Sequence, residues 1–422
     1  MTGHAAHHTH SMTASDSASP KPACILVCNC GSSSIKFAVV QPADGAQPIN
    51  GIAECLGSAE ASLQWRVDGG DRQQRPLAGA DHAQALQAIV AVIDQANVPA
   101  PMAVGHRVVH GGDRFTASAL LDAAMLQEIQ AVSHLAPLHN PANLEGIAAA
   151  QAAYPQLPQV GVFDTAFHQS MPEHAYRYAV PEAWYQDHGV RRYGFHGTSH
   201  RYVAHQAAKI LGQEPSSLAL VTAHLGNGCS AAAVLGGQAV DTTMGLTPLE
   251  GLVMGTRSGD LDPGIIAFMA QRLQTDAETV TNALNKHSGL LGLSDGLSND
   301  MRQLVQARDE GHAGAALAID VFCYRLAKHI AGLAVAMGRL DALVFTGGIG
   351  ENAAPIRAQV LRHLGIFAMH EDPQRNARHG SMSGSRITQD EGGIALVVPT
   401  NEELQIARET LAVVRAAQGA SA

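Results

Sequence analysis

Short apolar runs separated by glycine- and serine-containing turns open the chain. Residues 23–28 form an apolar run of the buried-strand type, and residues 37–40 form a second one. Between them lies the polar octapeptide Asn-Cys-Gly-Ser-Ser-Ser-Ile-Lys at positions 29–36. Two apolar runs on either side of a glycine–serine turn predict a β-hairpin.

The same pattern continues along the chain and predicts alternating sheets and helices. Strands are predicted at 51–56, 63–67, from 103, from 160, and at 218–224, 231–235, 238–243, 342–346 and 393–398. Helices are predicted at 81–95, 120–135, 143–153, from about 198 to 211, at 313–340 and at 403–416. Thr198 or Ser199 is expected to cap its helix, and Asp262 to cap one that opens at Pro263. Residues 347–352 are expected to form a glycine turn.

The opening pattern recurs about half the chain later. A strand at 218–224 leads into the glycine turn 226–230, and two further strands follow. The triplets Gly-Ser-Ser at 31–33 and Gly-Asn-Gly at 226–228 occupy matching places. This repetition predicts one β-β-β unit used twice, with helices packed on each sheet and a cleft between the halves.

The first hairpin carries groups that suit phosphate binding. Gly31 lets the backbone approach a ligand, Ser32 and Ser34 add hydroxyls, and Lys36 adds a positive charge. The spacing is not that of a P-loop, and no helix follows directly. A hairpin with a solvated lysine is the alternative interpretation.

Composition narrows the class of protein. A length of 422 residues favours two or three domains, and 46% apolar residues indicate a globular chain. The net charge of −10 argues against a general nucleic-acid surface, so a phosphate ligand needs a local basic cluster. No apolar stretch reaches the ~18 residues of a membrane span, and a cytoplasmic location is the default expectation.

The N-terminal segment and the cysteines give weaker signals. Residues 1–22 contain four histidines and no apolar core of a signal peptide, so a disordered leader is expected, with metal pickup as the alternative. Six cysteines are too few for a disulfide framework in a chain of this length. Cys24, Cys28 and Cys30 share one strand face and are expected to be buried, with a metal or redox site as the alternative.

Charged and polar residues at strand ends point to a site. Arg107 lies inside an apolar run, where it needs either an ion pair or an anion ligand. Asp164 follows a strand, at the edge where open α/β sheets bind ligands. His196 and His200 flank a Gly-Thr-Ser turn, but the absence of a nearby third ligand disfavours a metal site.

Eight motifs in order give the chain a family resemblance. They are NCGSSSIK (29–36), GHRVVHGG (105–112), FDTAFH (163–168), RYGFHGTSH (192–200), HLGNG (224–228), MGTRSGDLDP (254–263), FTGGIGEN (345–352) and PTNEE (399–403). In these motifs the chain resembles the acetate kinase (acetokinase) family of the acetate and sugar kinase, Hsp70 and actin superfamily. The resemblance extends over about residues 24–412, and the motifs show no departure from the family pattern.

The resemblance implies an α/β fold and a reaction. The fold would comprise two ribonuclease H-like (actin-like ATPase) lobes with duplicated βββαβαβα topology, one at 23–166 plus 404–422 and the other at 167–403. The activity would be that of an ATP:acetate phosphotransferase, which converts ATP and acetate reversibly into ADP and acetyl phosphate with Mg²⁺, or Mn²⁺ in its place. The resemblance also implies a homodimer.

It further implies roles for particular residues. The catalytic residues would be Arg107, Asp164, His196 and Arg257, and the metal residues Asn29 and Glu402. Acetate would contact Arg107, Val109, Leu138, Phe195 and Pro248. ATP would contact Ser32, Ser34, Lys36, His224, Leu225, Gly226, Asn227, Gly228, Asp300, Met301, Arg302, Gly347, Gly348, Ile349, Gly350, Glu351 and Asn352.

The chemistry fits these residue types. A carboxylate nucleophile is ionised at neutral pH and needs relief from phosphate repulsion rather than a strong base. Arg107 and Arg257 supply that relief, and their replacement is expected to slow turnover with little loss of stability. A propionate or butyrate kinase is the nearest alternative, because one methylene changes binding by only ~1–3 kcal/mol. A non-catalytic, ATP-gated scaffold or chaperone is the alternative from another class, but it would not need two arginines beside His196.

Overall fold

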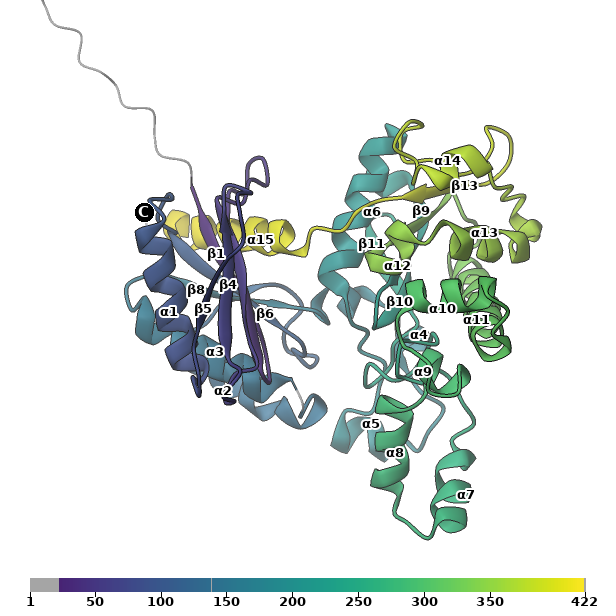
Figure 1. The fold of residues 1–422 in the computed structure, drawn as a ribbon, viewed down its shortest axis with the longest axis horizontal. Coiled ribbons are helices and arrows are strands. Elements are labelled where there is room, and N and C mark those ends of the chain that lie inside the picture. The colour runs from purple at the N-terminus through teal and green to yellow at the C-terminus, as the bar shows by residue number, and fades with distance from the viewer. Residues whose placement is uncertain (1–22, 138, 421–422) are drawn as a thin grey trace, which may run out of the picture.

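The computed structural model describes residues 23–137 and 139–420 of the chain. The expected disordered leader at 1–22 and the predicted substrate residue Leu138 therefore lie outside the described residues. The described part forms two lobes that lie side by side, each built on one β-sheet (Figure 1).

The first sheet has eight strands in the order β5-β4-β3-β2-β1-β6-β8-β7. They are β1 (Ile25–Gly31), β2 (Ser34–Val40), β3 (Ile49–Glu54), β4 (Ser62–Val67), β5 (Gln73–Pro76), β6 (Ala103–Val108), β7 (Ala119–Leu120) and β8 (Gln159–Phe163). β1 runs antiparallel to β2 and parallel to β6, which runs parallel to β8. The carboxyl ends of β1, β6 and β8 therefore meet at one edge of the sheet.

The second sheet has five strands in the order β11-β10-β9-β12-β13. They are β9 (Ala219–Leu225), β10 (Cys229–Leu235), β11 (Gln238–Thr242), β12 (Ala342–Thr346) and β13 (Ile394–Val397). β9 is antiparallel to β10 and parallel to β12, which is parallel to β13. This arrangement repeats that of β3-β2-β1-β6-β8, so the predicted duplication is confirmed.

Helices cover both sheets and form the outer parts of the second lobe (Figure 1). The α-helices are α1 (His82–Gln95), α2 (Ala123–Ala131), α3 (Asn140–Ala153), α4 (Glu173–Tyr176), α5 (Glu182–His188), α6 (Gly197–Leu211), α7 (Gly264–Leu273), α8 (Ala277–Lys286), α9 (Gly289–Leu293), α10 (Met301–Asp309), α11 (Ala313–Met337), α12 (Gly347–Asn352), α13 (Ala354–His363), α14 (Pro373–Ala377) and α15 (Glu402–Ala420). Short 3₁₀ helices are Ser133–Leu135, Ala166–Ser170, Pro215–Ser217 and Gly365–Phe367.

The core of the first lobe follows the alternation along β1. Leu26 points to the face covered by α1, where it joins a buried cluster with Leu86. Ile25 and Val27 point to the opposite face and pack with Ile406 of α15. Apolar side chains on both faces explain why β1 reads as a continuous apolar run, and why the last helix of the chain packs on the first sheet.

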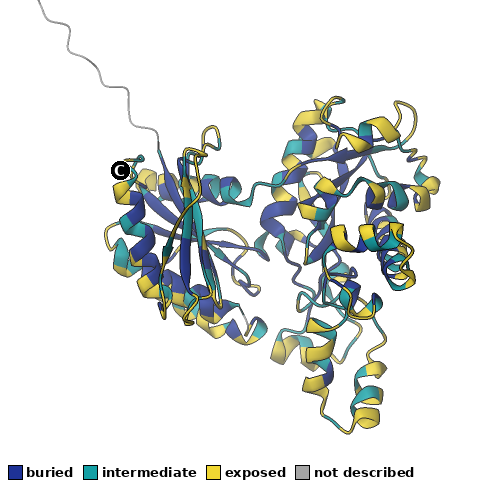
Figure 2. Ribbon diagram, in the orientation of Figure 1, coloured by how far each residue is buried: buried dark blue, intermediate teal, exposed yellow. Residues whose placement is uncertain are grey.

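The second lobe is also built as helix, sheet and helix (Figure 2). On one face, Val221 belongs to the same buried cluster as Phe322 of α11. On the other face, Leu220 belongs to a cluster with Val203 of α6. The sheet is therefore buried on both sides, and only strand ends are available to a ligand.

Two local predictions about turns and caps are wrong. Residues 347–352 form helix α12 rather than a turn, because Gly347 leaves β12 at φ 76° and the chain coils at once. Neither Thr198 nor Ser199 caps α6, since His196 is the N-cap and makes no side-chain cap hydrogen bond. Ser199 Oγ instead lies 2.8 Å from both His224 Nδ1 and Thr400 Oγ1.

Three helix starts also differ from the prediction. The segment before α2 pairs with β8 as β7, so that helix begins only at Ala123. α3 begins at Asn140 because Pro141 sits in its first turn, where no backbone donor is needed. α7 begins at Gly264, one residue beyond Pro263, and Asp262 accepts a hydrogen bond from the Gly264 backbone (2.8 Å).

The cysteines behave as small apolar residues. Cys24, Cys28 and Cys30 are buried in the core beneath α1 and α3, as predicted, and burial raises the pKa of the Cys30 thiol to about 12. Among residues 23–137 and 139–420, no group of three or more His, Cys, Asp or Glu side chains is arranged to hold a metal ion. A metal site on this strand is therefore disfavoured.

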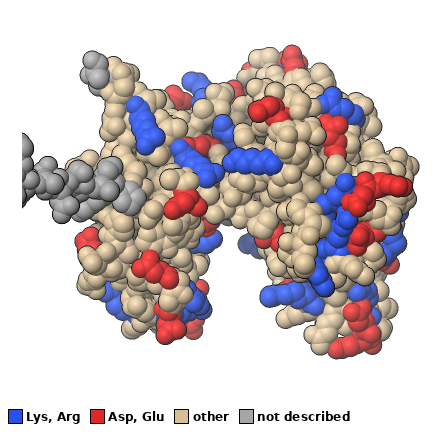
Figure 3. All heavy atoms as spheres, turned by 90° about the horizontal axis from the view of Figure 1, so that it is seen from above, with Lys and Arg blue, Asp and Glu red and all other residues tan. Residues whose placement is uncertain are grey.

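The surface carries charges of both signs. On the face shown in Figure 3, acidic and basic side chains are interspersed over both lobes, and a deep notch separates the lobes. Over the part of the chain that the structure describes, no helix has the length and apolar character needed to cross a membrane.

Candidate active site

Arg107 and Asp164 form a two-pronged ion pair at the carboxyl edge of the first sheet. Arg107 Nη2 donates to Asp164 Oδ2 (2.6 Å), and Nε donates to Oδ1 (3.0 Å). The Asp164 side chain is 1% exposed and that of Arg107 is 22% exposed. Burial opposes the charge on Arg107, but the carboxylates of Asp164 and Glu402 outweigh it and raise its pKa above the ordinary value. Arg107 is thus a fixed cation whose guanidinium still reaches the cleft.

This pairing changes one expectation from the sequence. A cleft arginine with no partner could be removed at little cost to stability. Because Asp164 is almost fully buried and its carboxylate accepts side-chain hydrogen bonds only from Arg107 within the described chain, removing Arg107 leaves a buried charge without its partner. Arg107 is therefore expected to contribute to stability as well as to turnover.

Arg257 is held differently. It lies in the loop between β11 and α7, where its Nη1 donates to the Pro248 carbonyl oxygen (3.2 Å) and lies 3.9 Å from Met254 Sδ. No carboxylate pairs with Arg257 among the described residues, and burial lowers its pKa. A half-buried guanidinium with unused donors is well suited to bind an anion.

His196 lies beside Arg257. Its backbone adopts a left-handed conformation (φ 56°) at the start of α6, and its Nδ1 lies 2.9 Å from Ser230 Oγ. Its ring stacks on that of His224 with centroids 4.5 Å apart. Burial, reinforced by His224 and Arg107, lowers the pKa of His196 well below the ordinary value. The ring is therefore neutral at physiological pH, with one nitrogen able to donate.

The glycine turn after β9 brings these groups together. A β-carbon on Gly228 would lie 3.5 Å from His196 Nε2 and 3.6 Å from Arg257 Nη1. The positive charges of both Arg107 and Arg257 act on His196. The predicted catalytic residues of the two lobes thus gather around one point, and their roles in catalysis stay a prediction.

Three of the residues predicted to enclose the methyl group of acetate, Val109, Phe195 and Pro248, connect to these catalytic groups. Val109 follows β6 and packs against the core cluster that contains Phe195. Pro248 supplies the carbonyl oxygen that holds Arg257. Apolar residues thus adjoin His196 along the chain or contact Arg257, which is compatible with a small carboxylic acid as ligand.

The first hairpin is tighter than a phosphate loop. Gly31 pairs with Ser34, so only two residues, including Ser32, make the turn. Asn29 and Lys36 are direct partners in the register and therefore project from the same face. This face is the one that carries Arg107 and Glu402, since all four residues line a small cavity of about 190 Å³.

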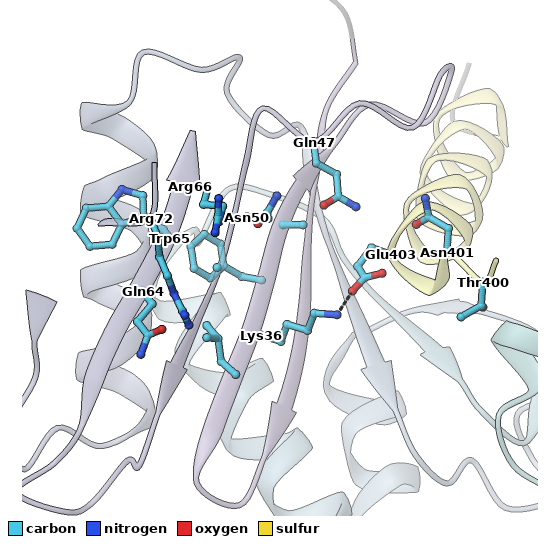
Figure 4. A pocket seen from close by; sticks show the side chains of 14 residues that line it. Lys36, Gln47, Asn50, Gln64, Trp65, Arg66, Arg72, Thr400, Asn401 and Glu403 are labelled. Carbon is cyan, nitrogen blue, oxygen red and sulfur yellow. Dashed lines mark hydrogen bonds and ion pairs between the residues drawn. The ribbon is translucent and has the colours of Figure 1, made fainter. Parts of the chain in front are cut away.

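Lys36 also borders a larger cavity. Figure 4 shows it reaching from β2 to form an ion pair with Glu403 at the start of α15. The cavity, of about 550 Å³, continues over β3 and β4 to Arg66 and Arg72. Lys36 is thus engaged by a carboxylate rather than directed at the serine hydroxyls.

The predicted metal residues share the small cavity. Burial raises the pKa of Glu402, and the positive charge of Arg107 partly offsets this effect. Asn29 and Glu402 offer two oxygen ligands, which is too few for a closed cage. Magnesium commonly binds through one or two carboxylates, waters and substrate phosphates, so the residues fit that ion.

A second large cavity, of about 880 Å³, opens between the glycine turn after β9, α10 and α12. Its lining includes eight residues predicted to contact ATP: Gly226, Asn227, Asp300, Met301, Arg302, Gly348, Ile349 and Asn352. Asp300 caps α10 and forms an ion pair with Arg302, which lowers the pKa of Asp300 to about 2. The cavity has the size and the mixed lining expected for a nucleoside.

Other predicted ATP residues support this cavity rather than line it. Glu351 Oε1 accepts hydrogen bonds from the backbone nitrogens of Gly347 (3.0 Å) and Thr400 (3.1 Å), which ties α12 to the strand that leads to α15. The Leu225 side chain is fully buried in the core. Gly350 is buried as well. Leu225, Gly350 and Glu351 therefore support the backbone around the cavity without lining it.

Several residues that build the site were not predicted from the sequence. Asn143 Oδ1 accepts from the Val109 backbone (3.0 Å), and its Nδ2 donates to the Cys30 carbonyl (2.7 Å), which fixes the ends of β6 and β1 together. Ser230 holds His196, and burial, reinforced by the charges of Arg257 and Arg107, lowers the pKa of His139. A polar residue on a buried helix face is the only sign by which Asn143 could be found.

Comparison with known proteins agrees with this geometry. Residues 24–408 match the model of the Acetokinase family. The acetate kinase of Ectopseudomonas mendocina (strain ymp) is 58% identical over 389 residues, which is 92% of this chain and 98% of that protein. The crystal structure of Porphyromonas gingivalis acetate kinase superposes with a TM-score of 0.87 at 40% identity, over 93% of this chain and 100% of the other.

A crystal structure of a propionate kinase from Francisella tularensis superposes equally well. Its TM-score is 0.88 at 44% identity, and it covers 93% of this chain and 100% of the other. The similarity extends over both lobes in each comparison, well beyond what a shared fold requires. This protein therefore belongs to the acetokinase family.

Proposed function

We propose that this protein is an acetate kinase, which transfers the γ-phosphoryl group of ATP to acetate and gives ADP and acetyl phosphate reversibly. The observation that carries the proposal is the convergence of Arg107, Arg257 and neutral His196 at the glycine turn after β9. The identity of 58% with an acetate kinase supports the same activity. A scaffold that only bound ATP would not need an uncompensated cation beside apolar residues.

In this proposal the acetate carboxylate binds Arg257, and its methyl group packs against Val109, Phe195 and Pro248. The carboxylate oxygen attacks the γ-phosphorus in line, and the bond to the ADP oxygen breaks. Arg107, oriented by Asp164, binds the equatorial phosphoryl oxygens as charge spreads over them. His196 donates a hydrogen bond to the same group, and each such donor is worth ~10²–10³ in rate.

The nucleotide would span the two lobes. Its adenosine would occupy the cavity of about 880 Å³ beside α10, and its phosphates would extend past the turn 226–228 toward the first hairpin. Asn29 and Glu402 would hold magnesium partly through water, and the ion, when bound, would neutralise phosphate charge. Lys36 would exchange its ion pair with Glu403 for a phosphate oxygen.

The proposed lobes are 23–166 with 404–422, and 167–403. Packing of α15 against β1 supports assigning the C-terminal helix to the first lobe. A cytoplasmic location is proposed as well, and the free state of all six cysteines supports it, because reducing compartments keep thiols free.

We also propose a homodimer formed through α7. None of the residues of α7 is buried, and its apolar side chains are strongly exposed: Ile265 (39%), Phe268 (55%) and Leu273 (64%). The hairpin of α7 and α8 projects from the second lobe (Figure 1). A second copy is the partner that would cover such a face. Phe268→Glu should shift the protein to a monomer in light scattering, and an unchanged mass would rule out this surface.

Propionate is the second candidate substrate, because the Francisella tularensis propionate kinase matches both lobes at 44% identity. Trapping of acyl phosphates with hydroxylamine, with ATP and each of acetate, propionate and butyrate, tests the proposal. Acetate should give the highest kcat/KM. A higher value for propionate would assign the chain to the second candidate, and no acyl phosphate from any acid would refute both.

A further inference from the structure

A chain of buried polar side chains lies behind His196 and is not used in the mechanism above. His196 Nδ1 lies 2.9 Å from Ser230 Oγ, and the same oxygen lies 2.7 Å from His200 Nε2. His200 Nδ1 in turn lies 2.7 Å from Thr222 Oγ1. Ser230, His200 and Thr222 are each 0% exposed. We call these three residues, together with His196, the histidine relay.

The directions of these hydrogen bonds follow from counting protons. A neutral imidazole has one donor and one acceptor nitrogen, and a hydroxyl has one proton to donate. If Thr222 donates to His200 Nδ1, then His200 donates from Nε2 to Ser230, and Ser230 donates to His196 Nδ1. Every hydroxyl and imidazole proton inside the relay then has an acceptor, and the remaining proton of His196 lies on Nε2.

The opposite direction is costly. If His196 carried its proton on Nδ1, the relay would run back through Ser230 and His200 to Thr222. The Thr222 hydroxyl would then need another acceptor, and within the described residues no other side-chain or backbone group hydrogen-bonds to it. A buried donor without an acceptor costs ~1–3 kcal/mol. If His196 and His200 both donated to Ser230, its oxygen would accept twice and its own proton would have no acceptor within the described residues. If neither donated, the single Ser230 proton could serve only one of the two nitrogens, and two lone pairs would face each other at the other.

We propose that Thr222, His200 and Ser230 are positioning residues that fix His196 in the tautomer with its proton on Nε2. The Cε1–Nε2 edge of His196 faces Gly228, because a β-carbon there would lie 3.5 Å from both atoms. The relay therefore directs the only N–H donor of the neutral ring toward the turn where Arg257 lies. It also prevents that N–H from being donated to Ser230. Burial keeps His200 neutral, as the relay requires.

The relay spans three elements of the second lobe. Thr222 lies on β9, Ser230 on β10 and His200 on α6, so the tautomer of one cleft residue depends on a hydroxyl two side chains away. A residue that merely filled space at position 222 would have no effect on the proton of His196. Because the Thr222 hydroxyl is two side chains away from His196, a change of the His196 tautomer on substitution of Thr222 would indicate the relay rather than direct packing.

Nitrogen-15 NMR of histidine-labelled protein at neutral pH reports the tautomer without any substrate. The signals of His196 are assigned by their loss in His196→Gln. We expect a pyrrole-type shift at Nε2 and a pyridine-type shift at Nδ1 in the unmodified protein. A pyrrole-type Nδ1 would overturn the proposal directly, whatever the enzyme's activity.

Kinetics of matched variants provide the second half of the test, which rests on the proposed function. Ser230→Ala and Thr222→Val should both move His196 toward a mixture of tautomers. Loss of a residue that orients a catalytic group lowers activity by ~10–100-fold. We expect this decrease in kcat, while KM for acetate should change by less than about twofold. Thr222→Ser keeps the hydroxyl and should restore both the shift and the rate.

Thr410→Val is the control, because Thr410 is buried, its hydroxyl has no partner within the described chain, and it lies on α15 outside the relay. It should change neither the shift nor the rate. Unchanged tautomer and kcat in Ser230→Ala would overturn the relay even if the enzyme is active. If the unmodified protein forms no acetyl phosphate, the proposed function fails, while the NMR result still decides the relay.

Discussion

Arg107→Ala and Arg257→Ala should together separate the effect of a cleft arginine on turnover from its effect on stability. Either substitution alone would not distinguish these two effects. In the proposed mechanism Arg107 binds the transferring phosphoryl oxygens and Arg257 binds the attacking carboxylate, so each change should lower kcat/KM for acetate by at least ~10²-fold. Their structural partners differ, because Arg107 pairs with buried Asp164 while Arg257 donates to a backbone carbonyl. The two variants should therefore lose similar activity and very different stability.

The magnitude for Arg107 follows from the burial of its partner. Removing one member of a buried ion pair costs ~3–5 kcal/mol when both are fully buried. Asp164 is 1% exposed, but Arg107 is 22% exposed and water can replace part of its contacts. We therefore expect Arg107→Ala to lose ~2–3 kcal/mol, somewhat less than the cost for a fully buried pair. Arg257→Ala gives up one hydrogen bond, worth ~1 kcal/mol, and is relieved of the cost of burying a cation.

Urea unfolding of both variants and of Asp164→Ala, followed by circular dichroism, measures these differences. The double variant Arg107→Ala with Asp164→Ala serves as the control, because it leaves no charge without a partner. It should be more stable than Arg107→Ala alone by ~1 kcal/mol or more, although neither is active. If Arg107→Ala and Arg257→Ala unfold at the same urea concentration, or if the double variant is no more stable, then Asp164 does not depend on Arg107 as argued here.

The remaining predictions concern the acid, the metal and pH. The kcat/KM for propionate should be about tenfold below that for acetate, since ~1.4 kcal/mol is tenfold, and Val109→Ala should narrow this gap; equal use of butyrate would show that the pocket is misassigned. Activity should require Mg²⁺ or Mn²⁺, and Glu402→Gln should raise the metal concentration needed, whereas full turnover in excess chelator would remove the metal assignment. Burial lowers the pKa of His168 and His224 to about 4, below the ~6.5 of a histidine in the unfolded chain. The unfolded chain therefore binds more protons between these two values, so the free energy of unfolding is highest above pH ~6.5 and falls toward pH 4 by ~1.4 kcal/mol per pH unit for each ring. Denaturant titrations across this pH range should show that loss, and a flat profile would mean that these rings are accessible to protons.

The sequence predicted the sheets well because both of their faces are covered. Strands such as β1 and β12 are continuous apolar runs bounded by glycine turns, and few other structures have that pattern. The repeat of the first hairpin at 226–228 was enough to predict the duplicated topology. The starts of the helices were predicted less well. Pro141 lies in the first turn of α3, and the residues before α2 pair with β8 as strand β7, a contact that the local sequence pattern does not show.

Residue types in the site could be predicted, but not their partners. Arg107 in an apolar run indicated an ion pair or an anion ligand, and only the folded chain, with β6 parallel to β8, shows that Asp164 accepts from its Nε and Nη2. The roles of Ser230 and Thr222 depend on contacts between different elements, so the sequence around each gives no sign of them. Glu351 looked like a nucleotide ligand because of its motif, and its backbone contacts became visible only in the folded chain.

Direct phosphoryl transfer to the acid is the central claim, and phosphorus-31 NMR with oxygen-18-labelled acetate tests it most directly. The enzyme, ATP and magnesium are incubated with acetate labelled in both carboxylate oxygens. Attack by the carboxylate predicts acetyl phosphate whose phosphorus signal carries the isotope shift of one bridging oxygen-18, formed together with ADP. Release of unlabelled inorganic phosphate without acetyl phosphate, or acetyl phosphate with no bridging label, would contradict it.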